Sequence, residues 1–146
     1  RALGRIIHQQ LPLEVAARNV TDYALGARIE IRRGDLFAGL GARRYDVIIA
    51  NPPYVTAASM RALPPEYRHE PELALASGDD GLDAVRGILA GARRHLKSAG
   101  IVAVEVGGNR AIVEQAFPDI PFTWIGSASG EGMVFLLQQE HLPERA

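Results

Sequence analysis

The sequence predicts an α/β fold built on a mainly parallel β-sheet. Residues 45–50 and 101–106 are dominated by Val, Ile and Ala, as in strands that are covered on both faces in the middle of such a sheet. Segments with the apolar spacing of helices lie between the strand-like segments. The chain ends in two strand-like segments separated by a Gly-containing turn, which predicts an antiparallel hairpin.

Composition limits the class of protein. The 146 residues are 47% hydrophobic and 23% charged, which matches one globular domain or the larger part of one. A formal net charge of −1 gives no basic field to attract nucleic acid. The absence of cysteine excludes disulfides and thiolate ligands and is typical of a reducing compartment. No apolar run reaches the roughly 18 residues of a membrane span, and the first residues lack a signal-peptide core, so we expect a cytoplasmic protein without a membrane partner or a metal site.

The first half of the chain predicts one helix, two strands and a long loop. Residues 11–25 have helical apolar spacing and end before Gly26, a favourable C-terminal cap. Residues 28–32 alternate polar and apolar side chains and then break at Gly34, which predicts a strand before the one at 45–50. Residues 55–75 are irregular and rich in proline, and loops of this length are usually binding segments.

The second half predicts two helices and three strands. A helix is expected to begin at residues 79–82, because acidic residues favour a first turn, and to end at Gly100 after a basic last turn. The remaining elements are strands at 101–106, 121–125 and 133–137 and a short helix at 110–117. The last two strands are expected to pair antiparallel, and the sequence gives no sign of a repeat or a second domain.

The strand at 45–50 ends in the unusual sequence Asn51-Pro52-Pro53-Tyr54. Neither proline has the N–H that a sheet ladder needs, and each fixes its own φ. The strand therefore stops at Asn51, which is left in an extended and rigid conformation.

Three polar or small residues follow predicted strands directly: Asp35, Asn51 and Gly107. Ligands of α/β sheets bind outside the carboxyl ends of the strands. We therefore expect these three residues at one edge of the sheet. A turn residue is the alternative interpretation of Asp35.

The groups of the Asn51 turn favour alkylation of a poorly nucleophilic –NH₂. The Asn51 side-chain oxygen and the Pro52 carbonyl are two acceptors that can hold both hydrogens of an amide or aryl amine, and Tyr54 adds an aromatic face. Such acceptors orient the nitrogen and stabilise the positive charge that develops on it. A plain turn is the alternative, although it seldom needs two prolines and an aromatic residue.

The Asn51–Tyr54 motif resembles the signature of methyltransferases that use S-adenosylmethionine to modify adenine, guanine or protein glutamine. Residues 63–82, LPPEYRHEPELALASGDDGL, resemble a block of the glutamine methyltransferases that act on release factors and ribosomal protein. The segment EYRHEPEL and residues 121–124 are most similar to the branch that modifies the third large-subunit ribosomal protein. The similarity extends from residue 13 to residue 137.

The resemblance implies roles for particular residues. Asp35 and Leu36 match the segment that flanks the adenine of S-adenosylmethionine, and Asn51 matches the residue that touches both cofactor and target amide. Pro52, Pro53 and Tyr54 match the target-binding and catalytic turn, and Glu70 lies in the His-Glu-Pro segment that is expected to bind substrate. The implied partner is a protein of the translation apparatus, and nucleic acid is not required.

Glu105 also matches a strand end of these enzymes. A structural carboxylate within an apolar strand is the alternative interpretation.

The first residues depart from the family pattern. The family resemblance implies an opening strand with a Gly-rich turn and a second strand that ends in an acidic residue, and residues 1–10 contain neither. We therefore expect residues 1–146 to be the C-terminal part of a Rossmann-like methyltransferase catalytic domain without its first two strands. Alone, the chain is expected to bind S-adenosylmethionine weakly, to transfer no methyl group, and to self-associate through an exposed edge at 45–50.

Two other functions stay open at this stage. The same motif would permit methylation of an exocyclic amine in DNA or RNA, which predicts a basic groove and a flipped-base pocket. The chain would otherwise be an inactive remnant that keeps only a fold or a binding surface. Titration with S-adenosylmethionine separates the remnant from the enzymes, and the choice between ribosomal protein and DNA as acceptor separates the two enzymes.

Overall fold

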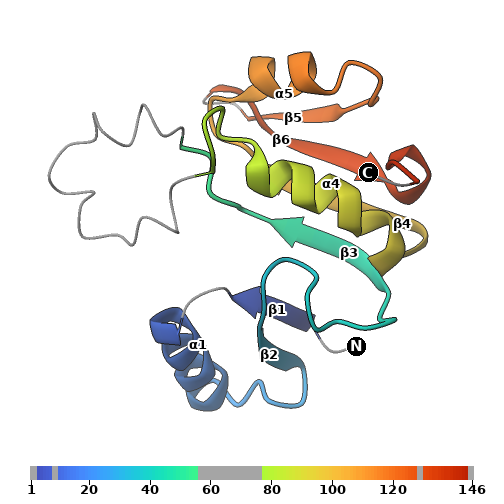
Figure 1. The fold of residues 1–146 in the computed structure, drawn as a ribbon. Helices are drawn as coiled ribbons and strands as arrows, with labels where there is room; N and C mark the ends of the chain where they lie inside the picture. The colour runs from blue at the N-terminus through green and yellow to red at the C-terminus, as the bar shows by residue number, and fades with distance from the viewer. Residues whose placement is uncertain (1–2, 8–9, 56–76, 128–129, 145–146) are drawn as a thin grey trace, which may run out of the picture. The chain divides into compact units, whose positions relative to one another are not determined.

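The computed structural model describes residues 3–7, 10–55, 77–127 and 130–144 (Figure 1). The chain divides into two compact units, Arg1–Gly41 and Ala42–Ala146, and each is described by itself. None of the helices in these described ranges has both the length and the apolar character needed to cross a membrane.

The unit Arg1–Gly41 is a β-α-β arrangement. Strand β1 (Leu3–Ile7) pairs in parallel with β2 (Ile29–Arg33), and helix α1 (Gln10–Asp22) connects them and packs against β2. The helix predicted at 11–25 and the strand predicted at 28–32 are confirmed, whereas β1 was not predicted.

Helix α1 ends before the expected boundary. Ala24 has a φ of 51°, and the Leu25 N–H donates to the Val20 carbonyl at 2.8 Å. This left-handed residue with a six-to-one hydrogen bond is the Schellman ending of a helix. Ala24 therefore takes the capping position that the sequence suggested for Gly26.

The unit Ala42–Ala146 contains a four-stranded mixed sheet in the order β3-β4-β6-β5. Its strands are β3 (Tyr45–Ala50), β4 (Leu96–Glu105), β5 (Thr123–Ser127) and β6 (Gly130–Gln138). The pair β3 and β4 is parallel, while β6 runs antiparallel to both β4 and β5. The α/β class and the terminal hairpin are confirmed, but the sheet of this unit is mixed rather than mainly parallel.

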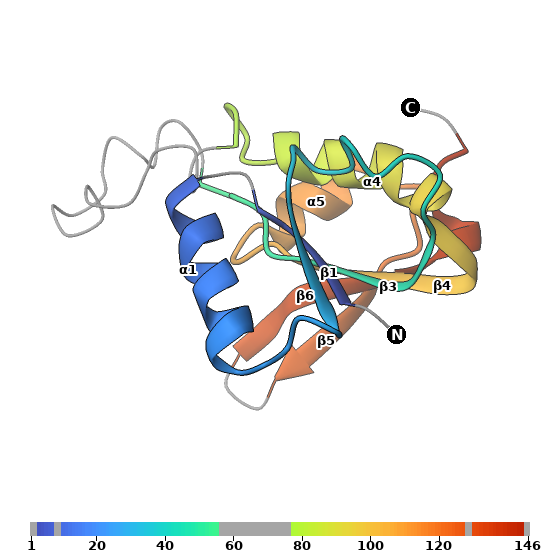
Figure 2. The same cartoon turned by 90° about the horizontal axis from the view of Figure 1, so that it is seen from below.

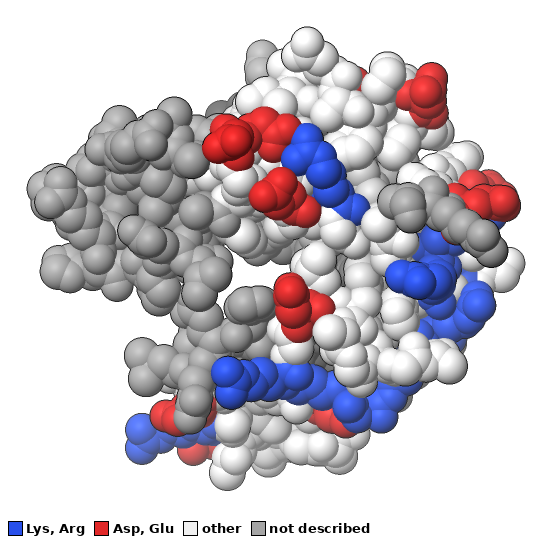
Figure 3. All heavy atoms as spheres, in the orientation of Figure 1, with Lys and Arg blue, Asp and Glu red and all other residues white. Residues whose placement is uncertain are grey.

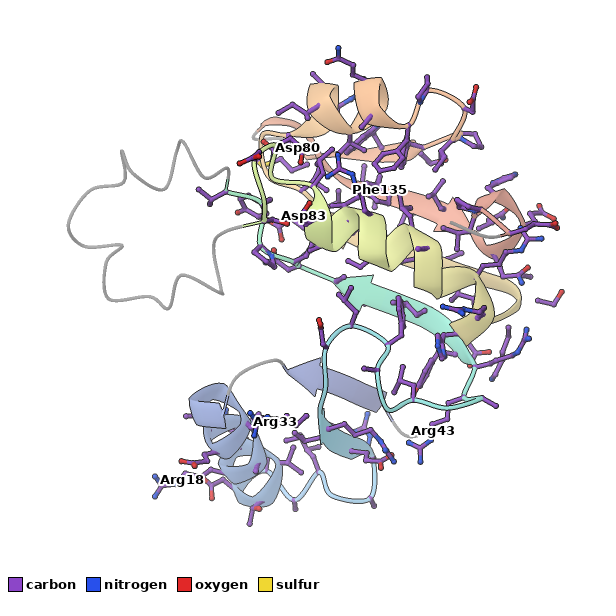
Figure 4. All side chains as sticks on the ribbon, in the orientation of Figure 1. Arg18, Arg33, Arg43, Asp80, Asp83 and Phe135 are labelled. Carbon is purple, nitrogen blue, oxygen red and sulfur yellow. The ribbon has the colours of Figure 1, made fainter. Side chains whose placement is uncertain are left out.

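One face of this sheet is covered by helices α4 (Asp83–His95) and α5 (Arg110–Ala116) (Figure 2). Alternate residues of the strands point into the resulting core. The fully buried side chains include Val85, Leu89, Val102, Val104, Val113 and Phe135. Phe135 projects from β6 into this core (Figure 4) and meets Trp124 of β5 with ring centroids 5.6 Å apart. A short 3-10 helix, η2 (Gln139–His141), follows β6.

The prediction that residues 45–50 form a central strand covered on both faces is wrong for β3. Its strand neighbour in the described part of the chain is β4, so β3 forms an edge of this sheet. Ile49 is 80% exposed and Val47 is 49% exposed. An apolar run alone does not distinguish a central strand from an edge strand, because both satisfy the same β-propensity.

The boundary between α4 and β4 also differs from the expectation. The helix ends at His95, and Leu96 is already extended, with φ −97° and ψ 144°. Strand β4 then pairs Leu96 with Tyr45 and, after an irregularity, Ile101 with Val47. Gly100 lies inside β4 and not at a helix end. A larger residue there would be crowded, because a Cβ would be 3.1 Å from the Tyr45 carbonyl oxygen and 2.8 Å from that of Lys97.

Candidate active site

The carboxyl ends of β3 and β4 lie side by side. The two strands are parallel, and their register pairs Ala50 with Val104. Asn51 follows β3 and Gly107 follows β4 by two residues. The prediction that Asn51 and Gly107 share one sheet edge is therefore confirmed. Asp35 belongs to the other unit, so its place at this edge stays a prediction.

The turn after β3 presents one polar side chain and buries its neighbour. Asn51 is exposed, whereas Pro52 is buried and Pro53 and Tyr54 are half-buried. The Asn51 carboxamide makes no hydrogen bond to any other described residue. The two prolines restrict the backbone at Asn51, and a ligand would not have to displace a protein hydrogen bond to reach the carboxamide.

Tyr54 is held by residues from two other segments. Its carbonyl oxygen accepts a hydrogen bond from Asn109 Nδ2 at 2.7 Å. Gly107, which has a φ of 54°, lies against the Tyr54 ring, and Gly81, with a φ of 77°, lies against the Tyr54 carbonyl. Gly107 was predicted at this sheet edge from the sequence, whereas Asn109 and Gly81 were not. The available signal was the Gly-Gly-Asn sequence directly after a strand, which is typical of a functional loop.

The segment before α4 joins this site to the helix. The Ser77 N–H donates to the Val55 carbonyl at 3.1 Å, and the Ser77 hydroxyl accepts from the Ala84 N–H at 3.0 Å. The backbone that leaves the Asn51–Tyr54 turn at Val55 therefore meets the backbone that enters α4. The predicted loop between them, including Glu70, lies outside the described residues.

Charged side chains gather at the start of α4. Asp80 accepts a hydrogen bond from the Leu82 N–H at 3.0 Å and forms an ion pair with Arg86, which also pairs with Asp83 at 3.2 Å. Asp80 and Asp83 are labelled in Figure 4, and Figure 3 shows the acidic side chains gathered there with a basic one beside them. The hydrogen bond from Arg86 and that from the Leu82 N–H lower the pKa of Asp80 to about 2.

The other predicted site residues in the described ranges are Asp35, Leu36 and Glu105. The Asp35 carbonyl accepts from the Ala38 N–H at 2.8 Å, so Asp35 begins a turn after β2, and Leu36 has a left-handed φ of 47°. A bulky residue in that region is uncommon. Glu105 is half-buried in β4 opposite Val134. Within the described ranges, no group of three His, Cys, Asp or Glu side chains is placed to hold a metal ion.

No family model matches the chain. Curated proteins named "Ribosomal protein uL3 glutamine methyltransferase" match it closely. Those of Neisseria gonorrhoeae and Bordetella pertussis are 54% and 52% identical over 130 residues, which cover 89% of this chain. That of Burkholderia pseudomallei is 51% identical over 138 residues, or 90% of this chain. The aligned region covers 43%, 44% and 45% of these three proteins, so the chain spans less than half of their length. The chain is therefore homologous, over about nine-tenths of its own length, to a segment of the ribosomal protein uL3 glutamine methyltransferases.

Proposed function

We propose that this chain supplies the target-binding side of an S-adenosylmethionine-dependent methyltransferase active site, and that the acceptor is the side-chain amide nitrogen of a glutamine in a ribosomal protein. The observation that carries this proposal is the exposed Asn51 carboxamide on a proline-stiffened turn at the end of a parallel strand. The names of the relatives support a ribosomal protein over a release factor as substrate. Such a substrate is met in the cytoplasm.

The chemistry requires hydrogen-bond acceptors more than a base. The lone pair of an amide nitrogen is delocalised into its carbonyl, so the nitrogen is a weak nucleophile. The Asn51 side-chain oxygen and the Pro52 carbonyl would accept hydrogen bonds from the two N–H groups of the glutamine amide. These bonds would orient the nitrogen and stabilise positive charge as it develops there. The Tyr54 ring would pack on the planar amide.

When bound, S-adenosylmethionine would supply the methyl group. The amide nitrogen would bond to the methyl carbon as its bond to the sulfonium sulfur breaks, the sulfur would leave as a neutral thioether, and the nitrogen would release one proton to water. In this chain Asn51 would contact the cofactor at the end of β3, and Asp35 and Leu36 would flank its adenine. The exposed, unbonded carboxamide of Asn51 fits this role. A Gly-rich turn and an acidic residue for the ribose have no counterpart in residues 1–10, and the greater length of the relatives leaves room for both elsewhere. We propose a Rossmann-like sheet for the complete enzyme, which the parallel β3–β4 pair and the terminal β5–β6 hairpin support.

A chimera tests the proposal. The matched segment of the Neisseria gonorrhoeae relative is replaced by the corresponding residues of this chain, and the purified protein is incubated with uL3 and labelled S-adenosylmethionine. We expect one methyl group on a uL3 glutamine side chain, located by peptide mass spectrometry, with the unaltered relative as positive control. A folded chimera that binds S-adenosylmethionine but leaves uL3 unmodified, or that labels DNA or RNA instead, would contradict the proposal.

A further inference from the structure

We propose that Asn109 and Gly107, in the loop after β4, are positioning residues for the Asn51–Tyr54 turn. Together they fix the carbonyl and the ring of Tyr54, so that a defined side of the ring meets the planar target amide. The inference rests on the proposed function, because it assigns further residues to the same site. Neither residue belongs to the turn that touches the target.

The first observation is that Asn109 does not cap its own helix. It is the N-cap residue of α5, a position where Asn is favoured because its side-chain oxygen accepts an N–H of the first turn. Its side chain makes no such bond. Instead, Nδ2 donates to the Tyr54 carbonyl at 2.7 Å, across 55 residues of sequence. The side chain is therefore used for the β3 turn rather than for α5.

The second observation is the contact between Gly107 and the Tyr54 ring. A Cβ on Gly107 would lie 2.7 Å from Tyr54 Cε2, and 3.0 and 3.1 Å from the two carbons on either side of it. Both neighbouring carbons are only 0.3 and 0.4 Å farther from this position than Cε2 itself, which places the position above the face of the ring at Cε2; an approach in the ring plane would put both carbons much farther away. The Gly107 backbone thus lies against one face of the ring near Cε2, and the opposite face is the one assigned to the target amide.

Gly81 closes the arrangement from the segment before α4. A Cβ at this position would lie 2.6 Å from the Tyr54 carbonyl oxygen and 3.0 Å from Asn109 Nδ2. The absence of a Cβ at Gly81 therefore leaves the Tyr54 carbonyl and the Asn109 amide room for their hydrogen bond. Two segments, the loop after β4 and the segment before α4, therefore contact the peptide group that follows Tyr54.

Exact placement of this peptide group matters for rate. A reacting nitrogen must be held within a fraction of an ångström of its productive position, and a misplacement of 1 Å costs about a hundredfold in rate. Loss of the Asn109 hydrogen bond should act on the catalytic step and leave the binding of S-adenosylmethionine unchanged, since neither Asn109 nor Gly107 is part of the proposed cofactor contacts.

Asn109→Asp separates positioning from helix capping. Asp has the same shape and is an equally good N-cap, and its charge favours a helix N-terminus, so α5 should remain stable. It has no donor for the Tyr54 carbonyl, and its carboxylate repels that oxygen. Asn19→Asp, the same change at an exposed position of α1, is the matched control.

The variants are measured in two ways. In the 146-residue chain, the Gly107 Hα that points at the Tyr54 ring should show an upfield NMR shift, and this shift should decrease in Asn109→Asp while circular dichroism stays unchanged. In the chimera, Asn109→Asp should lower kcat about tenfold or more, with KM for S-adenosylmethionine within about twofold of the parent.

Each outcome decides the inference. A lower kcat together with a lost ring shift, and neither effect in Asn19→Asp, supports it. An active chimera whose Asn109→Asp variant keeps its kcat overturns the positioning role but leaves the proposed function in place. A parent chimera that methylates no glutamine overturns the proposed function and the positioning role with it.

Discussion

The two parallel strands β3 and β4 end next to each other but in opposite ways. The turn after β3 leaves the Asn51 carboxamide exposed and without a hydrogen bond to another described residue. The loop after β4 instead contacts the protein itself. The Asn109 side chain donates a hydrogen bond to the Tyr54 carbonyl, and the Gly107 backbone packs on the Tyr54 ring. Two asparagines at the same sheet edge therefore do different work: one is available to a ligand and the other holds the first loop in place.

This difference indicates that the Asn51–Tyr54 turn depends on contacts from residues outside the motif. A rigid turn needs supporting contacts to keep its groups in one position, and those contacts come from residues that are distant in sequence. The supporting residues carry no chemistry of their own, so their substitution should change geometry before it changes binding. The following variants test whether the two loops differ in this way.

The largest effect is expected for Asn51→Ala. It removes one of two acceptors for the target –NH₂ and should lower the methylation rate of the chimera about a hundredfold or more. The folded state should be almost unaffected, because the side chain is exposed. Initial rates with uL3 and a thermal melt of the same preparation measure both quantities. A rate within a few-fold of the parent would show that Asn51 does not bind the target, and Asn19→Ala serves as the exposed control.

Gly107→Ala should have the next largest effect. The added Cβ would lie 2.7 Å from Tyr54 Cε2, and the backbone φ of 54° is unfavourable for alanine. We expect a loss of about 1–3 kcal/mol of stability and a lower rate, since the ring must move away from its position.

Gly108→Ala is the matched control for Gly107→Ala, because its Cβ would meet no atom within 4 Å. Chemical denaturation of both variants and the parent gives the comparison. If the two alanine variants are equally stable, Gly107 is not in close contact with Tyr54 in solution.

Much of the fold was predictable because local patterns determine it. Apolar spacing identified α1, the acidic start and basic end identified α4, and β3 has the bounds that the sequence indicated. Strand β1 was missed because five residues with a glycine and an arginine, LGRII, carry little period. The early start of β4 at Leu96 was missed because a local irregularity and the positive φ of Ala99 depend on pairing with β3.

Only the Asn51–Tyr54 turn of the candidate site was predictable from the sequence. The Asn51–Tyr54 motif combines two prolines with an aromatic residue, and this combination is visible without any tertiary information. Asn109 looks like an ordinary helix cap, and its contact with Tyr54 depends on the parallel pairing of two strands. Long-range contacts of this kind have no signature in a single sequence.

The strands themselves differ as their loops do, since β3 lies at a sheet edge and β4 in the interior. Unpaired edges and exposed apolar side chains favour association, so the 146-residue chain should form oligomers at high concentration. Ile49→Lys, at a side chain that is 80% exposed, should increase the monomer fraction several-fold in sedimentation velocity. Ile112→Lys on α5 is the control, and an identical distribution for all three proteins would exclude β3 as the contact.

The smallest effect is expected for a change at Asp80, in the segment that precedes α4. Asp80 forms an ion pair with Arg86 and accepts a hydrogen bond from the Leu82 N–H. The pKa of Asp80 is lowered from 3.8 to about 2, so its contribution to stability is present above about pH 4 and is lost as the pH falls toward 2. Asp80→Asn removes the ion pair but keeps an acceptor for Leu82. The difference in Tm between parent and variant should therefore be small near neutral pH, because exposed ion pairs contribute little. It should decrease further between about pH 4 and about pH 2 as Asp80 becomes protonated. Asp119→Asn, at an exposed position, is the control. A Tm difference for Asp80→Asn that stays constant down to about pH 2 would show that the ion pair with Arg86 does not stabilise the segment before α4.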